Sequence, residues 1–134
     1  MTDLQITGMD HIVLNVADID RSLGFYTDVL GLKPERVEQF KKGEVGFPSV
    51  RISEGTLIDL MKMNGPVVNE GIAHNLNHFC LVADGVDLEA LIETLKSKDV
   101  PVLRGPVSRW GARGQSMSVY FLDPDGNEIE VRCY

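Results

Sequence analysis

Apolar and polar residues alternate in the first half of the chain in a way that predicts one strand, one helix and three further strands. The first strand is expected over Met9–Val16, and Asp18 is suited to cap a helix over Ile19–Leu30. One face of that helix is apolar, and Gly31 is placed to end it. The apolar face comprises Ile19, Leu23, Tyr26 and Leu30. The later strands are expected over Lys33–Phe40, Phe47–Ile52 and Thr56–Met61.

The same order of elements begins again after residues 63–75, which collect Gly, Pro and Asn and predict a connecting loop. A strand is expected over Asn77–Ala83, followed by a helix with the apolar stripe Leu88, Leu91, Ile92 and Leu95. Further strands open at Pro101 and Val102, cover Ser116–Leu122, and close the chain as Glu128–Cys133 after a DPDG turn. The pattern predicts an α+β fold, in which residues 1–134 form one domain of two tandem βαβββ modules, at about residues 8–63 and 76–134.

Polar residues repeat together with the apolar pattern, which tests the repeat more strictly than alternation alone. His11 and His78 each come early in the first strand of their half, after Met-Asp and Leu-Asn. Asp59 and Glu130 each follow a glycine turn and lie in the last strand of their half. The offsets, 78 − 11 = 67 and 130 − 59 = 71, differ by four residues, the size of a small insertion. The second half is therefore predicted to repeat the first.

The repeated polar residues are expected on the sheet faces that the helices leave open. Side chains alternate across a strand, and the neighbours of these four residues form the more apolar set, which should pack under the helices. If the two sheets curve toward each other as one mixed sheet, their open faces enclose a cleft in which two imidazoles and two carboxylates converge. Such donors suit one divalent metal, Zn, Ni, Mn or Fe(II), with open positions for water or substrate.

Composition narrows the classes of protein. With 134 residues, 43% hydrophobic and 25% charged, the chain fits one globular domain. Its 13 basic and 20 acidic residues give a net charge of −7, which opposes binding to nucleic acid or to an anionic membrane surface. Export and membrane-spanning signals are absent from the sequence, so a cytoplasmic location is expected. Cys80 and Cys133 lack CxxC spacing and are expected to be reduced thiols.

Two segments resemble the vicinal oxygen chelate superfamily, the glyoxalase/bleomycin resistance/extradiol dioxygenase family. The segment DHIVLNVADIDRSLGFYTDVLGL resembles the opening strand and helix of this superfamily, and SVYFLDPDGNEIEV resembles its closing pair of strands. The similarity covers nearly the whole chain and implies the glyoxalase/bleomycin resistance/dioxygenase fold around a metal cleft. It also implies a homodimer, in which modules pair within one chain or are exchanged between chains.

The resemblance further implies that His11, His78 and Glu130 occupy the three positions where most metal-dependent members place ligands. Asp59 lies at the fourth position, where glyoxalase I usually has Glu. Because Asp is one methylene shorter, Asp59 would bind the ion directly or through a water molecule.

Three other residues are candidates for binding the substrate. Tyr120 is expected either to direct its hydroxyl into the cleft, as a tyrosine at the matching place does in fosfomycin enzymes, or to be a half-buried aromatic residue. Arg109 and Arg113 lie in SRWGARGQ, which predicts a flexible loop that clamps an anionic group, with solvated charges as the alternative. His74 in the connecting loop is expected to be solvated or to assist acid–base chemistry.

Carboxylates at both repeated positions favour a glyoxalase I-like enzyme, a lactoylglutathione lyase. It would isomerise the hemithioacetal of methylglyoxal and glutathione through an enediolate whose charge the metal stabilises, with Glu130 as the base and Asp59 as its counterpart. Three alternatives stay open: fosfomycin-type addition of a thiol or water to an epoxide, extradiol ring cleavage with Fe(II), and a non-catalytic module that sequesters a ligand. In every case the expected partner is a small molecule.

Overall fold

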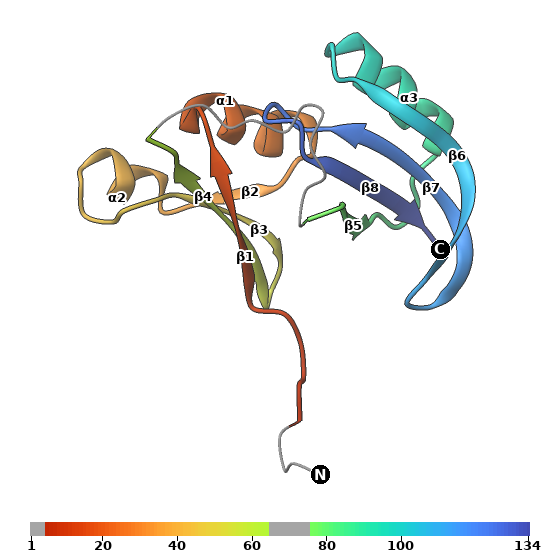
Figure 1. Cartoon of the computed structure of the whole chain (residues 1–134), viewed down its shortest axis with the longest axis horizontal. Coiled ribbons are helices and arrows are strands. Elements are labelled where there is room, and N and C mark those ends of the chain that lie inside the picture. Colours follow the sequence, from red (N-terminus) through yellow and green to blue (C-terminus); the bar gives the residue numbers. More distant parts are fainter. Residues whose placement is uncertain (1–4, 65–75) are drawn as a thin grey trace. The chain divides into compact units, whose positions relative to one another are not determined.

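Each half of the chain folds into a four-stranded sheet with helices beside it (Figure 1). The computed structural model describes residues 5–64 and 76–134, so His74 and most of the predicted connecting loop lie outside the described residues. The chain divides into two units, Met1–Val67 and Val68–Tyr134. The predicted α+β class and the tandem βαβββ order are confirmed.

The first module has the sheet order β1-β4-β3-β2, in which β1 and β4 run parallel and the other neighbours antiparallel. Its strands are β1 (His11–Val16), β2 (Lys33–Glu35), β3 (Ser49–Ser53) and β4 (Thr56–Lys62). Alternation works as predicted, because Leu14 and Val16 on β1 are buried while His11, Val13 and Asn15 are exposed.

The predicted helix over Ile19–Leu30 is confirmed in extent, although it has two parts. Asp18 caps it, since its side chain accepts a backbone N–H over 3.0 Å. The α-helix α1 (Ile19–Gly24) continues as a π-helical segment, η1 (Phe25–Val29). Gly31 then adopts a φ of 70°, a conformation that glycine takes without strain, and ends the helix as predicted.

The predicted strand over Lys33–Phe40 is wrong beyond its third residue. Strand β2 ends at Glu35, Arg36 adopts a left-handed conformation with a φ of 62°, and the short helix α2 (Val37–Lys41) follows. After this turn, Arg36 Nη2 donates to Asp59 Oδ1 on β4 over 3.1 Å. This contact joins residues that are 23 positions apart in the chain. The alternation of apolar and polar residues near Arg36 therefore cannot predict where the strand ends.

The second module has the order β5-β8-β7-β6, again with its first and last strands parallel. Its elements are β5 (Phe79–Val82), α3 (Leu88–Ser97), β6 (Val102–Gly111), β7 (Gly114–Leu122) and β8 (Glu128–Cys133). Helix α3 packs on β6 and β7 and buries Leu88, Ile92 and Leu95, three of the four predicted stripe positions. His78 lies immediately before β5.

The predicted flexible loop SRWGARGQ is wrong. Only Ala112 and Arg113 separate β6 from β7, and Gly111 pairs with Gly114 across this turn. Gly114 has a φ of 100°, which a residue with a side chain rarely adopts. Arg109 therefore belongs to a strand, and of the two predicted clamp residues only Arg113 lies in the turn.

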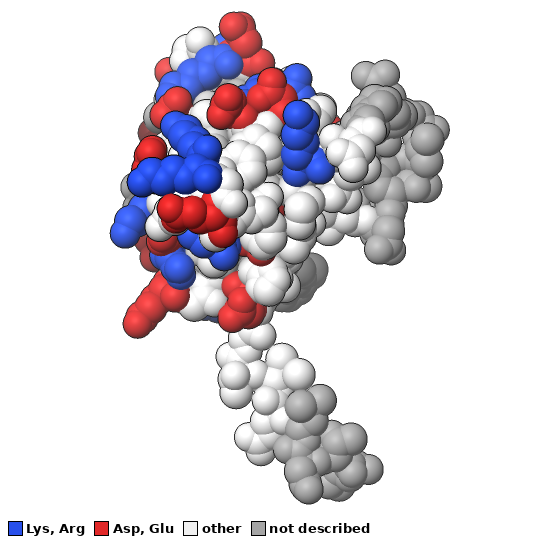
Figure 2. All heavy atoms as spheres, turned by 90° about the vertical axis from the view of Figure 1, so that its left-hand side faces the viewer, with Lys and Arg blue, Asp and Glu red and all other residues white. Residues whose placement is uncertain are grey.

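On the face shown in Figure 2, Lys and Arg side chains lie among Asp and Glu side chains. This face therefore has no extended area of a single charge. Within residues 5–64 and 76–134, no helix is long and apolar enough to cross a membrane.

Candidate functional site

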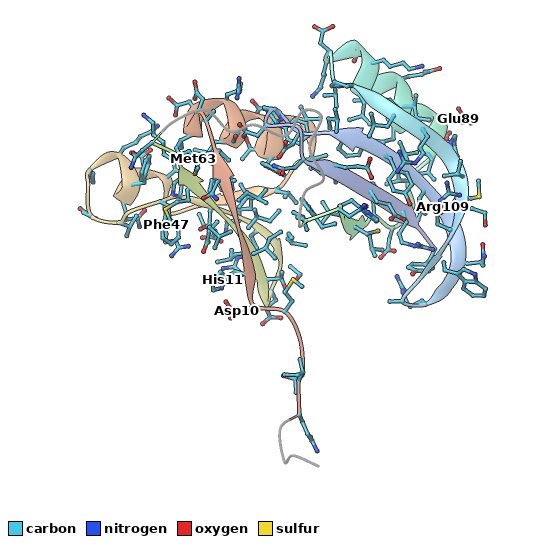
Figure 3. All side chains as sticks on the ribbon, viewed as in Figure 1. Asp10, His11, Phe47, Met63, Glu89 and Arg109 are labelled. Carbon is cyan, nitrogen blue, oxygen red and sulfur yellow. The ribbon has the colours of Figure 1, made fainter. Side chains whose placement is uncertain are left out.

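His11 and Asp59 form a polar pair in the first module. Strand β1 lies beside β4 in parallel register, and His11 Nε2 is 3.8 Å from Asp59 Oδ2. His11 Nδ1 lies 2.7 Å from Asp10 Oδ1, and Figure 3 shows the two side chains at the start of β1. Because an ionised carboxylate only accepts hydrogen bonds, Nδ1 donates to Asp10, and Nε2 is the ring nitrogen that faces Asp59.

The other carboxylate oxygen of Asp59 is already occupied. Asp59 is only 4% exposed, and its Oδ1 accepts hydrogen bonds from Ser49 Oγ over 2.5 Å and from Arg36 Nη2 over 3.1 Å. Ser49 stands directly opposite Asp59 in the β3–β4 register. These bonds satisfy one oxygen of the buried carboxylate and leave Oδ2 facing the imidazole.

His78 and Glu130 form the matching pair in the second module. His78 Nε2 lies 3.2 Å from Glu130 Oε1, and His78 Nδ1 lies 2.6 Å from Asn77 Oδ1. Glu130 is 4% exposed, and its Oε2 accepts from Ser118 Oγ over 2.5 Å and from Arg132 Nη1 over 3.4 Å. Each module therefore has the same arrangement: an anchored imidazole, a carboxylate facing it, and a serine and an arginine on the far carboxylate oxygen.

Sequence reasoning missed the two serines and the two arginines. Ser49 and Ser118 are offset by 118 − 49 = 69 positions, between the offsets of the His and carboxylate pairs, and each is followed by Val. The repeated Ser-Val dipeptide was therefore an available signal. Arg36 and Arg132 come from different places in their modules, a turn and the last strand, so no repeat pattern connects them.

Each pair has a geometry that a bound cation would stabilise. When Nε2 is unprotonated, it and the ionised carboxylate oxygen that it faces are both electron-pair donors, which one cation can bind together. Two ligand atoms about 2.1 Å from one ion lie roughly 3.0 Å apart at a right angle and roughly 3.4 Å apart at the tetrahedral angle. The 3.2 Å separation in the second module falls within this range, and the 3.8 Å separation in the first lies just outside it. The 3.8 Å separation is compatible with both predictions for Asp59: it would bind the ion directly after a small side-chain movement, or bind it through a water molecule.

The Glu130 carboxylate is stabilised as an anion. Burial raises its pKa, but hydrogen bonds from Ser118, Tyr120 and Cys80 outweigh burial and hold the pKa below its ordinary value. Burial and the same carboxylate raise the pKa of the Cys80 thiol to about 11, so the thiol stays protonated near neutral pH. Glu130 is therefore ionised, as a metal ligand or a proton acceptor must be.

The imidazole of His11 is more basic than an ordinary histidine. The hydrogen bond to Asp10 raises the pKa of His11 above 6.5, and the nearby Asp59 carboxylate adds to this effect. The same contact that orients the ring therefore also increases its electron-donating strength.

Tyr120 lies beside the His78–Glu130 pair of the second module, and a role in substrate binding stays a prediction. It stands opposite Glu130 in the β7–β8 register, and its ring centroid lies 5.6 Å from that of His78. The guanidinium of Arg104 lies 4.0 Å from the Tyr120 ring centroid, and that of Arg109 lies 6.0 Å away. Figure 3 shows Arg109 on β6. Tyr120 therefore lies between the His78–Glu130 pair, which it adjoins, and two cations near its own ring.

Arg113 is placed differently from Arg109. Its guanidinium lies 4.2 Å from the Tyr134 ring centroid, and its backbone N–H donates to the Tyr134 hydroxyl over 3.0 Å. The structure therefore associates Arg109 with Tyr120 and associates Arg113 with the C-terminal residue.

Each module supplies one imidazole and one carboxylate. In the described ranges, 5–64 and 76–134, no three His, Cys, Asp or Glu side chains gather into one metal-binding group. A shared set of His11, Asp59, His78 and Glu130 therefore stays a prediction that needs both modules.

Two βαβββ modules, each with a histidine beside a buried carboxylate, define a vicinal oxygen chelate protein. The chain belongs to the Glyoxalase/Bleomycin resistance protein/Dioxygenase superfamily, whose family model matches residues 8–131. The resemblance seen in the sequence is thereby confirmed.

Several relatives are similar over most of their length. A virulence protein of Salmonella typhimurium is 30% identical over 130 residues, which cover 96% of this chain and 85% of the relative. The metallothiol transferase FosB of Staphylococcus epidermidis is 27% identical over 131 residues, 96% of this chain and 82% of the relative. A probable lactoylglutathione lyase of Synechocystis sp. is 28% identical over 126 residues, 90% of this chain and 91% of the relative.

Among solved structures, an integron cassette protein from the mobile metagenome of V. pseudocholerae has a TM-score of 0.76 and 33% identity. The match covers 98% of this chain and 97% of that protein. A glyoxalase/dioxygenase from Nostoc punctiforme has a TM-score of 0.77 at 24% identity, a likeness of fold.

Proposed function

We propose that this protein is a divalent-metal-dependent enzyme with glyoxalase I-like activity, which isomerises the hemithioacetal of methylglyoxal and glutathione to a thioester. The observation that carries the proposal is the presence of a histidine–carboxylate pair in both modules, with one oxygen of each carboxylate facing its imidazole. The similarity to a probable lactoylglutathione lyase supports the same reaction class.

The metal would be held by His11, His78 and Glu130, with Asp59 as a direct or water-bridged fourth ligand. Zn, Ni, Mn and Fe(II) all suit this set of imidazole and carboxylate donors. When bound, such an ion supplies Lewis-acid stabilisation of negative charge on the substrate oxygens.

The carboxylates would move the proton. Isomerisation requires a base that removes a proton from one carbon and returns it to the neighbouring carbon. Glu130 is proposed for this role because Ser118 and Arg132 donate to its Oε2, while Oε1 faces the His78 imidazole and would accept the proton. Asp59 has the corresponding arrangement, with Oδ1 held and Oδ2 free, and is proposed as the counterpart on the other side of the substrate.

Tyr120 and Arg109 would orient an anionic substrate, and Arg113 would contribute from the turn. Arg109 donates to the backbone oxygen of Ser108 and forms no ion pair with a carboxylate among the described residues. Its positive charge is therefore available to a carboxylate of the glutathione adduct. The Tyr120 hydroxyl stays protonated, because burial and the Glu130 carboxylate raise its pKa, and so it serves as a hydrogen-bond donor.

The test is an activity assay on protein loaded in turn with Zn²⁺, Ni²⁺, Mn²⁺ and Fe²⁺. Thioester formation from the hemithioacetal is expected, and the variant His78→Ala should lose both the metal and the activity. If the protein binds metal but forms no thioester with any of these ions, the glyoxalase I assignment is wrong.

A fosfomycin-type addition of a thiol or water to an epoxide is the second candidate. It is favoured by Tyr120 with Arg104 and Arg109 around its ring, a setting suited to a phosphonate, and by the similarity to a metallothiol transferase. Consumption of fosfomycin by Mn²⁺-loaded protein, with and without a thiol, would distinguish this reaction from the isomerisation.

We also propose that residues 1–134 act as one domain of two modules, and that the protein is a cytoplasmic homodimer. Analytical ultracentrifugation of the metal-loaded protein should give twice the mass of one chain.

A further inference from the structure

Arg132 is a buried arginine that contacts both the Glu130 carboxylate and the end of the β6–β7 hairpin. It is only 3% exposed. Its Nη1 donates to Glu130 Oε2 over 3.4 Å and to the Trp110 carbonyl over 3.1 Å. Its Nη2 donates to the carbonyls of Arg109, over 3.0 Å, and Gly114, over 3.1 Å. One guanidinium therefore joins the carboxylate to three backbone carbonyls on both strands of the hairpin.

The space around this guanidinium is closely filled. A Cβ atom added to Gly111 would lie 2.4 Å from Arg132 Cζ, so glycine permits the close approach of the turn. The ring centroid of Tyr134 lies 4.7 Å from Arg132 Cζ. A lysine at this position has a single ammonium group and cannot donate in the two directions of the planar guanidinium fork.

The described part of the first module, residues 5–64, has no equivalent connection. Arg36 donates to Asp59 and Ser49, but among the described residues it has no hydrogen bond to a backbone carbonyl. It is also much more exposed, at 38% of its side chain. The arginine–carboxylate contact is thus duplicated between the modules, whereas within residues 5–64 and 76–134 only Glu130 is linked to a hairpin through its arginine.

We propose that Arg132 is a positioning residue that couples Glu130 to the hairpin end, residues 109–115, so that a ligand held by Glu130 orders this segment. When a bound ion fixes the carboxylate, the guanidinium loses freedom, and with it the three carbonyls that it holds. The hairpin end contains Arg109, the cation beside Tyr120, so the metal site and the substrate-binding cation become ordered together. This inference rests on the proposed metal site, and it adds a means by which the site prepares for an anionic substrate.

Hydrogen exchange of the backbone amides of residues 109–115 tests the coupling, with Zn²⁺ alone as the ligand. In the unaltered protein, Zn²⁺ should slow exchange in this segment several-fold. In Arg132→Lys the Zn²⁺-dependent slowing should vanish while calorimetry still detects Zn²⁺ binding. Arg36→Lys is the matched control and should keep the slowing. Trp110, the only tryptophan of the chain, gives an independent reading through its fluorescence anisotropy.

The Zn²⁺-dependent difference separates coupling from a merely structural role. A structural role would make residues 109–115 exchange faster in Arg132→Lys with and without Zn²⁺, and the slowing by Zn²⁺ would persist. That outcome, or Zn²⁺ binding without any slowing in the unaltered protein, would overturn the inference. If Arg132→Lys does not fold, Gly111→Ala displaces the same guanidinium and is judged by the same outcomes.

A metal-free comparison keeps this inference separate from the proposed function. Failure of the unaltered protein to bind Zn²⁺ would count against the metal site, and Glu130→Gln and Asp59→Asn would then be compared without metal. Faster exchange of residues 109–115 in Glu130→Gln only would support the link through Arg132. Equal exchange in the two variants would end it.

Discussion

Ser118 is fully buried, and its hydroxyl donates to the Glu130 carboxylate. The substitution Ser118→Ala removes this bond from the buried Oε2, to which Arg132 donates over a longer distance of 3.4 Å. We expect the free energy of unfolding, measured by urea denaturation of the metal-free protein, to fall by about 1–3 kcal/mol.

Ser53→Ala is the matched control, because Ser53 is an exposed serine on strand β3. It should change the free energy of unfolding by less than about 0.5 kcal/mol. Equal effects of the two substitutions would mean that the Ser118 hydroxyl contributes nothing to the buried carboxylate.

His11 should titrate above its ordinary pKa of 6.5 in metal-free protein, because its Nδ1 is hydrogen-bonded to Asp10. The raised pKa means that protonated His11 stabilises the fold below pH 6.5 and that this contribution is lost as the pH rises through the folded-state value. NMR titration of the imidazole should show a lower pKa in Asp10→Asn. An unchanged pKa in that variant would exclude the hydrogen bond as the cause.

At the scale of elements, periodicity predicts the helices and strands whose formation depends on nearby residues alone. The α1 and α3 helices follow from apolar residues on one face and from aspartate caps, and β8 follows from alternation after the DPDG turn. Strand β2 was predicted too long, because its end coincides with the left-handed Arg36 and that residue's distant contact with Asp59. Only the end of the β6–β7 hairpin differs from the prediction of a loop, because glycines on both sides of a two-residue turn resemble a flexible segment when the strand pairing is unknown.

Only part of the candidate site could be predicted, because the sequence reveals repeated positions but not tertiary contacts. His11, Asp59, His78 and Glu130 were found because a repeat places them in register, and the structure pairs them within each module. The groups that hold the far carboxylate oxygens required tertiary information, since Arg36 and Arg132 reach them from unrelated positions. The convergence of all four side chains on one ion stays a prediction.

The turn between β6 and β7 depends on the backbone of Gly114, whose φ is 100°. Gly114→Ala meets no atom within 4 Å, so its cost comes from backbone conformation alone. We expect a loss of about 1–3 kcal/mol in the free energy of unfolding. Gly46→Ala also meets no atom within 4 Å but has no left-handed φ, and it should cost much less. Similar losses in both variants would contradict this account of the turn.

At the scale of the whole molecule, one ion per chain is expected if the modules share a metal. Zn²⁺ at one hundred times its dissociation constant should stabilise the fold by about 2.7 kcal/mol, seen as a rise in Tm. His11→Ala and His78→Ala should each weaken this stabilisation, because each removes a ligand of the same ion. If one of them leaves Zn²⁺ binding and the Tm rise unaltered, the ion belongs to a single module.

The matched His–Ser–carboxylate arrangement in the two halves also allows a chain to be designed from two copies of one half. Each half contains a serine that donates to its own carboxylate, so the same local arrangement occurs in both. A chimera made by joining two copies of the second half would carry the His78–Glu130 pair twice, without any newly designed residue.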